Sequence, residues 1–70
     1  MNNFSKNLKH YRLLKKATQK EMADFLGVTI SCYQKYEYGQ REPLLDNIIK
    51  LAEYFNISID TLVGYTPKNN

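Results

Sequence analysis

Apolar residues recur at three- and four-residue spacing along most of this chain, a pattern that predicts helices and no strands. The clearest stretch is residues 18–39, where two short helical patterns meet at a glycine. Thr18, with Glu21 three residues later, has the spacing of a capping box, which predicts a helix from about Gln19. Its apolar stripe consists of Met22, Ala23 and Leu26. Gly27 follows, and glycine adopts the positive φ of a sharp turn at no steric cost.

A second helix is predicted over residues 30–38, after the capping residue Thr29 and before Gly39. Val28 is expected to fill the corner between the two helices. Helical spacing gives the second helix one face with Tyr33, Tyr36 and Glu37, predicted to point inward. The opposite face carries Ser31, Gln34, Lys35 and Tyr38, a row of hydrogen-bonding groups that suits the DNA major groove. Helix, short corner and helix form the helix-turn-helix pattern.

Three further helices are predicted around this pair. The first runs from about Phe4 or Ser5 to Lys15, with Ser5 as its cap and Leu8, Tyr11 and Arg12 facing inward. The neighbouring residues Leu13 and Leu14 cannot both be buried.

The fourth helix follows Pro43, and its predicted core face consists of Leu45, Ile48, Ile49, Leu51, Ala52 and Phe55. Asn56 is expected in the left-handed turn that ends it. Ser58 is expected to cap a short fifth helix over residues 59–63, which Gly64 ends. With residues 1–3 and 65–70 as loose tails, the fold class is all-α, one five-helix domain over residues 1–70.

Length and charge narrow the class of function. Seventy residues suffice for one domain and leave no room for a separate ligand-sensing module. The net charge is +3 and the pI about 9.1. The basic side chains that precede Glu21, the first acid, are Lys6, Lys9, Arg12, Lys15, Lys16 and Lys20. Beside a helix-turn-helix, this distribution favours a polyanion partner over a plain solvated face.

Side chains suited to catalysis or metal binding are too few to form a site. His10 and Cys32 are the sole histidine and cysteine, and they fall on different predicted helices. Cys32 is expected to act as a small, partly buried hydrophobe, which suits a reducing cytoplasm. No apolar run approaches the length of a membrane span. We therefore expect a cytoplasmic protein that is not an enzyme, binds no cofactor or metal, and has no membrane partner.

The order of these motifs resembles the Cro and C1-type repressor domain, also called the Xre family, over roughly residues 8–64. The resemblance is carried by residues 18–39, by Arg41-Glu42-Pro43 and by residues 48–62. It implies a lambda-repressor-like fold and a transcriptional regulator, a repressor, that binds specific double-stranded DNA. Two positions depart from the family pattern. Lys16 stands where glycine is frequent, and Leu44 stands where a serine cap is expected, so something other than a side-chain cap, burial for instance, is expected to hold that helix end.

The resemblance also implies roles for individual residues. Base contacts are implied for Ile30, Ser31, Gln34 and Lys35. Backbone contacts are implied for Thr18, Gln19, Thr29, Gln40 and Arg41, and Gln19 is further expected to brace a base-reading side chain. By their chemistry, Lys35 donates to guanine, Gln34 pairs with adenine, and Ile30 touches a thymine methyl, while Ser31 is permissive.

Two last implications concern stability and assembly. Arg12 and Glu37, both on inward faces, are expected to form a structural ion pair. A homodimer, at least on DNA, is implied through Asn56, Ile57, Ser58, Leu62 and Tyr65, with no small-molecule effector.

The alternative from another class of function is an antitoxin-like protein-interaction module, because a fold alone does not determine function. The polar outward row and the basic N-terminus favour DNA.

Overall fold

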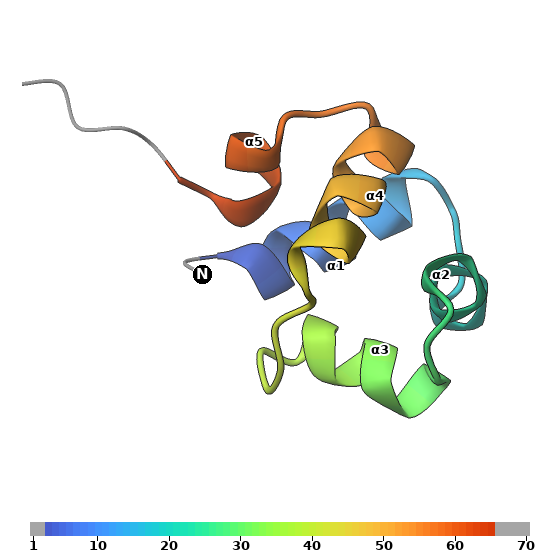
Figure 1. Cartoon of the computed structure of the whole chain (residues 1–70). Coiled ribbons are helices and arrows are strands. Elements are labelled where there is room, and N and C mark those ends of the chain that lie inside the picture. Colours follow the sequence, from blue (N-terminus) through green and yellow to red (C-terminus); the bar gives the residue numbers. More distant parts are fainter. Residues whose placement is uncertain (1–2, 66–70) are drawn as a thin grey trace, which may run out of the picture.

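The computed structural model describes residues 3–65, which form five helices with no strand among them (Figure 1). The helices are α1 (Phe4–Leu14), α2 (Gln19–Leu26), α3 (Ile30–Glu37), α4 (Leu45–Phe55) and α5 (Ile59–Val63). The predicted all-α architecture is confirmed. The tails predicted at residues 1–3 and 65–70 lie mostly outside the described residues.

All five helices contribute to a single core. Each has one side chain with no exposed surface: Leu8, Ala23, Tyr33, Leu51 and Leu62. Tyr36, with 4% exposed, joins them, so the inward face predicted for α3 is confirmed. Figure 1 shows α3 along the lower edge of the molecule and α5 at its upper edge. One face of α3 is thus available to a partner, while the other holds the helix on the core.

Two residues predicted for the core of α4 lie outside it. Leu45 is 63% exposed and Ile49 is 37% exposed. The buried residues of α4 are Ile48, Leu51, Ala52 and Phe55, which share one stripe by three- and four-residue spacing. Ile49 is exposed because it lies about 100° around the helix from Ile48. Leu45 lies on the buried stripe but one turn before Ile48, where the helix is no longer covered.

The N-terminal half of the chain corrects one further expectation. The cap of α1 is Asn3, in the left-handed conformation and with no side-chain hydrogen bond, so Ser5 lies inside the helix and does not cap it. Leu13 and Leu14 are both exposed, which agrees with the expectation that they cannot both be buried. After α1, Lys16 adopts a φ of 56°, the left-handed conformation that glycine provides more easily. The backbone between α1 and α2 therefore has the conformation that glycine would adopt there, although the residue is lysine.

The two ends of α4 differ in how they are held. Leu44, the residue before the helix, is 82% exposed, so burial of this residue does not hold the helix end in place of a cap. Its carbonyl instead accepts the amides of Asn47 and Ile48, at 3.0 and 3.1 Å, and closes the first turn. At the other end Asn56 has φ 57° and the amide of Ile57 reaches back to the carbonyl of Ala52, which confirms the left-handed turn.

Candidate nucleic-acid interface

The outward face of α3 is polar and accessible. Ser31 and Lys35 are exposed and Gln34 is half-buried, while Tyr33 and Tyr36 on the opposite face are buried. Ile30, the first residue of the helix, has 41% of its surface exposed. An exposed row of one hydroxyl, one amide and one ammonium group on a helix matches the donors and acceptors of base edges in a major groove.

The two helices of the motif begin at threonine caps. Thr18 Oγ1 accepts the amide of Glu21 at 3.0 Å, and Glu21 Oε1 accepts the amide of Thr18 at 2.8 Å, which completes the predicted capping box. Thr29 Oγ1 accepts the amide of Cys32 at 3.0 Å. Each threonine hydroxyl accepts in its cap and keeps its O–H group as a donor. The first amides of each helix also lack intrahelical acceptors, and together with the helix dipole they favour an anion.

A chain of side-chain hydrogen bonds leads inward from this face. Gln34 Nε2 donates to Gln19 Oε1 at 3.1 Å, and Gln19 Nε2 donates to Glu37 Oε1 at 3.1 Å. Gln19, the first residue of α2, therefore bridges the outward row of α3 and a carboxylate that is only 8% exposed. The terminal amide of Gln34, a half-buried residue, is thus held by a residue of α2.

The carboxylate of Glu37 is held in turn by Arg12. Arg12 Nε donates to Glu37 Oε2, and Arg12 Nη2 donates to Glu37 Oε1 at 3.1 Å, a two-point pairing of guanidinium and carboxylate. Arg12 Nη1 donates to the carbonyl of Ala17 at 2.9 Å. The structure thus brings the expected partners into contact and links α1, the first corner and the end of α3.

The electrostatics of this pair keep both members charged at neutral pH. Burial raises the pKa of Glu37, but the hydrogen bonds from Arg12 and Gln19 and the positive charge of Arg12 outweigh it, so the pKa lies below the usual value. The pKa of Arg12 is raised, first by its hydrogen bond to Glu37 and against the effect of burial. The pKa of Glu37 is lower in the folded state than in the unfolded state. The charged carboxylate therefore stabilises the fold above pH about 4.3, and this contribution disappears as the pH falls through the pKa of the folded state.

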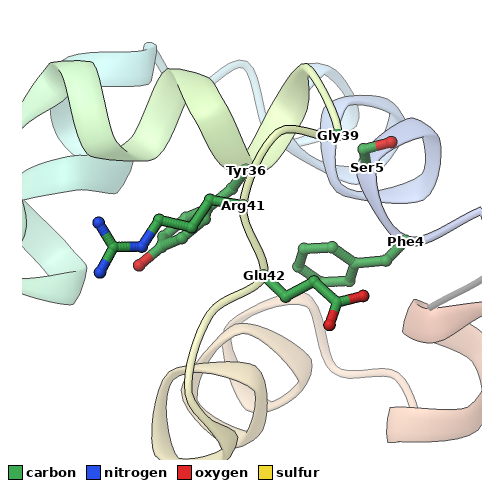
Figure 2. A pocket seen from close by; sticks show the side chains of 6 residues that line it. All are labelled: Phe4, Ser5, Tyr36, Gly39, Arg41 and Glu42. Carbon is green, nitrogen blue, oxygen red and sulfur yellow. The ribbon is translucent and has the colours of Figure 1, made fainter.

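The loop after α3 places two further predicted residues at the surface. Gly39 has φ 75°, and the amide of Gln40 donates to the carbonyl of Lys35 at 2.9 Å, which closes the end of the helix. The side chains of Gln40 and Arg41 are exposed. Figure 2 shows the Arg41 guanidinium directed away from α1, alongside Tyr36 and at the rim of a small pocket. The pocket is lined by Phe4, Ser5, Tyr36, Gly39, Arg41 and Glu42.

The residues expected at a dimer contact do not all lie on the surface. Asn56, Ser58 and Tyr65 are exposed and Ile57 is half-buried, but Leu62 has no exposed surface. Leu62 therefore belongs to the core, because the single buried position of this five-residue helix attaches α5 to the rest of the domain.

Asn7 is a structural residue that sequence reasoning did not identify. Its Nδ2 donates to the carbonyls of Thr61 and Leu62, at 3.2 and 3.1 Å, and so ties α1 to the last turn of α5. A single asparagine within a helical pattern carries no local signal of such a contact, because its acceptors lie more than fifty positions away in the sequence.

Two kinds of feature are absent from the part of the chain that the structure describes. Within residues 3–65, no helix has the length and apolar character needed to cross a bilayer. The same residues contain no group of three or more histidine, cysteine, aspartate or glutamate side chains placed to hold a metal ion.

Capped helices that meet at Gly27, the second with a polar outward face, define this molecule as a helix-turn-helix protein of the lambda-repressor-like fold. The helix-turn-helix family matches residues 8–62, and the chain belongs to that family. The resemblance to Cro and C1-type domains expected from the sequence is thereby confirmed.

Individual relatives agree with this assignment. An uncharacterized HTH-type transcriptional regulator of Bacillus subtilis, YqaE, is 45% identical over 60 residues, which cover 86% of this chain and 52% of YqaE. The cryptic phage CTXphi transcriptional repressor RstR of Vibrio cholerae is 45% identical over 47 residues, 67% of this chain and 42% of RstR. The chain spans about half the length of these curated relatives.

A similar fold is known from a solved structure. The crystal structure of a transcriptional regulator from Listeria innocua superposes with a TM-score of 0.90 at 31% identity, covering 96% of this chain and 63% of the other. An agreement over nearly the whole chain includes the helix-turn-helix corner and the helices that support it.

Proposed function

We propose that this chain binds specific double-stranded DNA as a transcriptional repressor and reads the major groove with α3. The observation that carries the proposal is the accessible polar row on α3, whose Gln34 is held by Gln19. Support also comes from relatives named as transcriptional regulators, and from RstR, which is named as a repressor. The proposed role is binding without catalysis, in the cytoplasm where a bacterial regulator meets DNA, and without a small-molecule effector.

Four residues are proposed to contact bases. Lys35 supplies an ammonium donor that suits the O6 and N7 acceptors of guanine, and Gln34 suits adenine, which offers one donor and one acceptor. Ser31 accommodates either kind of group, and Ile30 places apolar surface where a thymine methyl lies. The exposure of Ile30, at 41%, supports this role, because a core residue would not be available for contact.

Five residues are proposed to contact the phosphate backbone and set the orientation of α3. Thr18 and Thr29 supply hydroxyl donors beside the free amides of their helix ends, and Gln19 lies at the first of these ends. Gln40 and Arg41 follow α3 in an exposed loop. Such contacts position the protein and do not select the sequence, so their removal weakens all complexes alike.

Substitutions in these two groups are expected to have different effects. Replacing Gln34 or Lys35 by alanine should weaken binding to the preferred site by roughly 1 to 3 kcal/mol and relax the sequence preference, because a two-point base contact is lost. Replacing Arg41 by alanine should weaken binding to all duplexes to a similar extent. The measurement is selection of bound duplexes from a random pool, followed by titration of the selected and scrambled sites.

The variants at the base contacts Gln34 and Lys35 and the variant at the backbone contact Arg41 serve as controls for each other. All three side chains are accessible and none belongs to the core. If the Lys35→Ala variant selected the same consensus as the unchanged protein, the proposed orientation of α3 would be wrong. If the unchanged protein selected no duplex at all, the proposed function would fail, and a protein-interaction module would replace it.

We further propose that the DNA-bound form is a two-fold dimer. One recognition helix reads only a few base pairs, whereas two half-sites about 34 Å apart on one face of the duplex provide enough sequence. The proposed contact consists of Asn56, Ile57, Ser58 and Tyr65, without the buried Leu62. Ile59, the first residue of α5, adds exposed apolar surface directly after Ser58.

The dimer is tested by footprinting and stoichiometry on a selected operator. We expect an inverted repeat occupied by two chains, because two-fold symmetry of the protein is mirrored in its site. The Tyr65→Ser variant should require a higher protein concentration for the same footprint, since it removes exposed apolar area from the contact. An asymmetric site that holds one chain would contradict the dimer.

A further inference from the structure

The last helix, α5, is too short to hold its own place in the fold. It has five residues, and so short a helix is unstable in isolation, because its nucleation costs more than its few hydrogen bonds return. Leu62 is its single buried residue, and Val63 beside it is half-buried against the core. These adjacent residues attach one side of the helix, which fixes its position but leaves its tilt to be set by another contact.

Asn7 of α1 provides this contact at the last turn of α5. Its Nδ2 donates to the carbonyls of Thr61 and Leu62, at 3.2 and 3.1 Å. The last carbonyls of a helix have no partner within the helix, so a donor from another element satisfies two of them at once. Asn7 is half-buried, and its neighbour Leu8 has no exposed surface, so the amide belongs to a well-packed part of α1. The two bonds therefore attach the end of α5 to a rigid helix.

Two of the proposed dimer contacts are bonded to α5. Ser58 lies at its start, where its Oγ accepts the amide of Thr61 at 3.0 Å. Tyr65 lies just after its end, where its amide donates to the carbonyl of Asp60 at 2.9 Å. Both Ser58 and Tyr65 are exposed. A change in the tilt of α5 would therefore move both of them relative to the rest of the domain.

We propose that Asn7 is a positioning residue for the DNA-bound dimer, because it fixes the tilt of α5 that brings Ser58 and Tyr65 of two chains together. The inference rests on the proposed two-fold dimer and extends it to a residue outside the contact. The Asn7 amide is engaged with carbonyls of its own chain, so it acts through α5 without touching the partner. A two-fold contact uses the same surface of both chains, so a misplaced α5 affects both halves of the interface.

The recognition helix is held by other contacts. α3 packs on the core through the buried Tyr33 and Tyr36. Glu37 at its end pairs with Arg12, and Asn7 takes part in neither bond of that pair. Loss of the Asn7 bonds should therefore weaken the pairing of two chains and leave the reading of one half-site by α3 unchanged. This separation distinguishes a positioning role from a general contribution to stability.

The test variant is Asn7→Asp, which keeps the shape of the side chain but offers only acceptors to the two carbonyls of α5. Asn7 is the fourth residue of α1, and a negative charge near the start of a helix is compatible with the helix dipole. The matched control is Asn3→Asp, the same change at the exposed cap of α1, where the side chain makes no cap hydrogen bond. A second variant, Asn7→Ala, removes the amide without adding a charge.

Affinities are titrated on the selected inverted repeat and on the same duplex with one half-site scrambled. Relative to Asn3→Asp, which has the same net charge, Asn7→Asp should bind the repeat about tenfold more weakly, the scale of two lost hydrogen bonds, and the single half-site equally well. Asn7→Ala should show the same selective loss relative to the unchanged protein. Insertion of about five base pairs between the half-sites turns them to opposite faces of the duplex, and on that duplex Asn7→Asp and Asn3→Asp should bind equally.

Thermal melting shows which variants are folded, and if only Asn7→Ala is folded its affinities decide. The inference is overturned if the ratio of affinities for the repeat and the single half-site is the same as in the reference protein, whether both affinities hold or both fall. It is also overturned if neither variant folds, because the role of Asn7 is then confined to the fold. The proposed function is judged on the unchanged protein: if that protein selects no duplex, or occupies its site as one chain, the failure is seen before any variant is measured.

Discussion

Replacing Arg12 by alanine is expected to lower the free energy of unfolding by about 3 to 5 kcal/mol, because it leaves the carboxylate of Glu37 buried without its partner. The carbonyl of Ala17 loses its donor in the same change. A loss of this size is a large share of the stability of a small domain. Denaturant unfolding of both proteins, followed by circular dichroism, measures the difference.

The matched control is Lys9→Ala on the same helix, since Lys9 is exposed and such substitutions usually change stability by less than about 0.5 kcal/mol. Glu37→Ala should lower the free energy of unfolding about as much as Arg12→Ala, because it leaves the buried guanidinium of Arg12 without its charged partner. If Arg12→Ala shifted the denaturation midpoint no further than Lys9→Ala, the pair would have no structural role.

Affinity for duplex DNA is expected to fall by about 10³-fold when the salt concentration rises from about 50 to about 200 mM. A dimer that places about six lysine or arginine groups on phosphates releases a matching number of condensed counterions, and each release is opposed by added salt. The candidate cations are Arg41, exposed in the loop after α3, and the exposed lysines that precede Glu21. Fluorescence titration of one selected duplex at four salt concentrations provides the slope of log affinity against log salt.

The matched variant for this measurement is Arg41→Ala, which should reduce the slope by about one for each protomer that loses a phosphate contact. Gln40→Ala, a neutral change in the same loop, should lower affinity without changing the slope. A flat dependence on salt, or no binding at low salt, would rule out the proposed DNA partner.

Local signals were sufficient to predict the helices and the corner between α2 and α3. The capping box at Thr18 and the turn at Gly27 depend on residues close in sequence, and both are present as predicted. The same holds for Asn56, because its left-handed conformation is a local property. The outward direction of Gln34 and Lys35 follows from helical spacing once the buried tyrosines are recognised.

Positions whose environment depends on distant segments were predicted less well. Leu45 and Ile49 fit the apolar pattern of α4 but are exposed, because the pattern does not show where the neighbouring helices end. Leu62 was expected at a dimer surface, yet it anchors α5 in the core. Asn7 carried no local signal, although its bonds hold α5 against α1.

The sequence by itself determined the helical class, the caps of α2, α3 and α5 and the identity of the polar row on α3, because these depend on residues within a few positions of one another. Only the tertiary structure decided which side chains meet across helices. The direction of the Gln34 amide is the clearest case, since it follows from Gln19 on another helix and from the buried Glu37. Hydrogen bonds between distant residues require the packed fold to bring donor and acceptor within about 3 Å, and no local pattern encodes that distance.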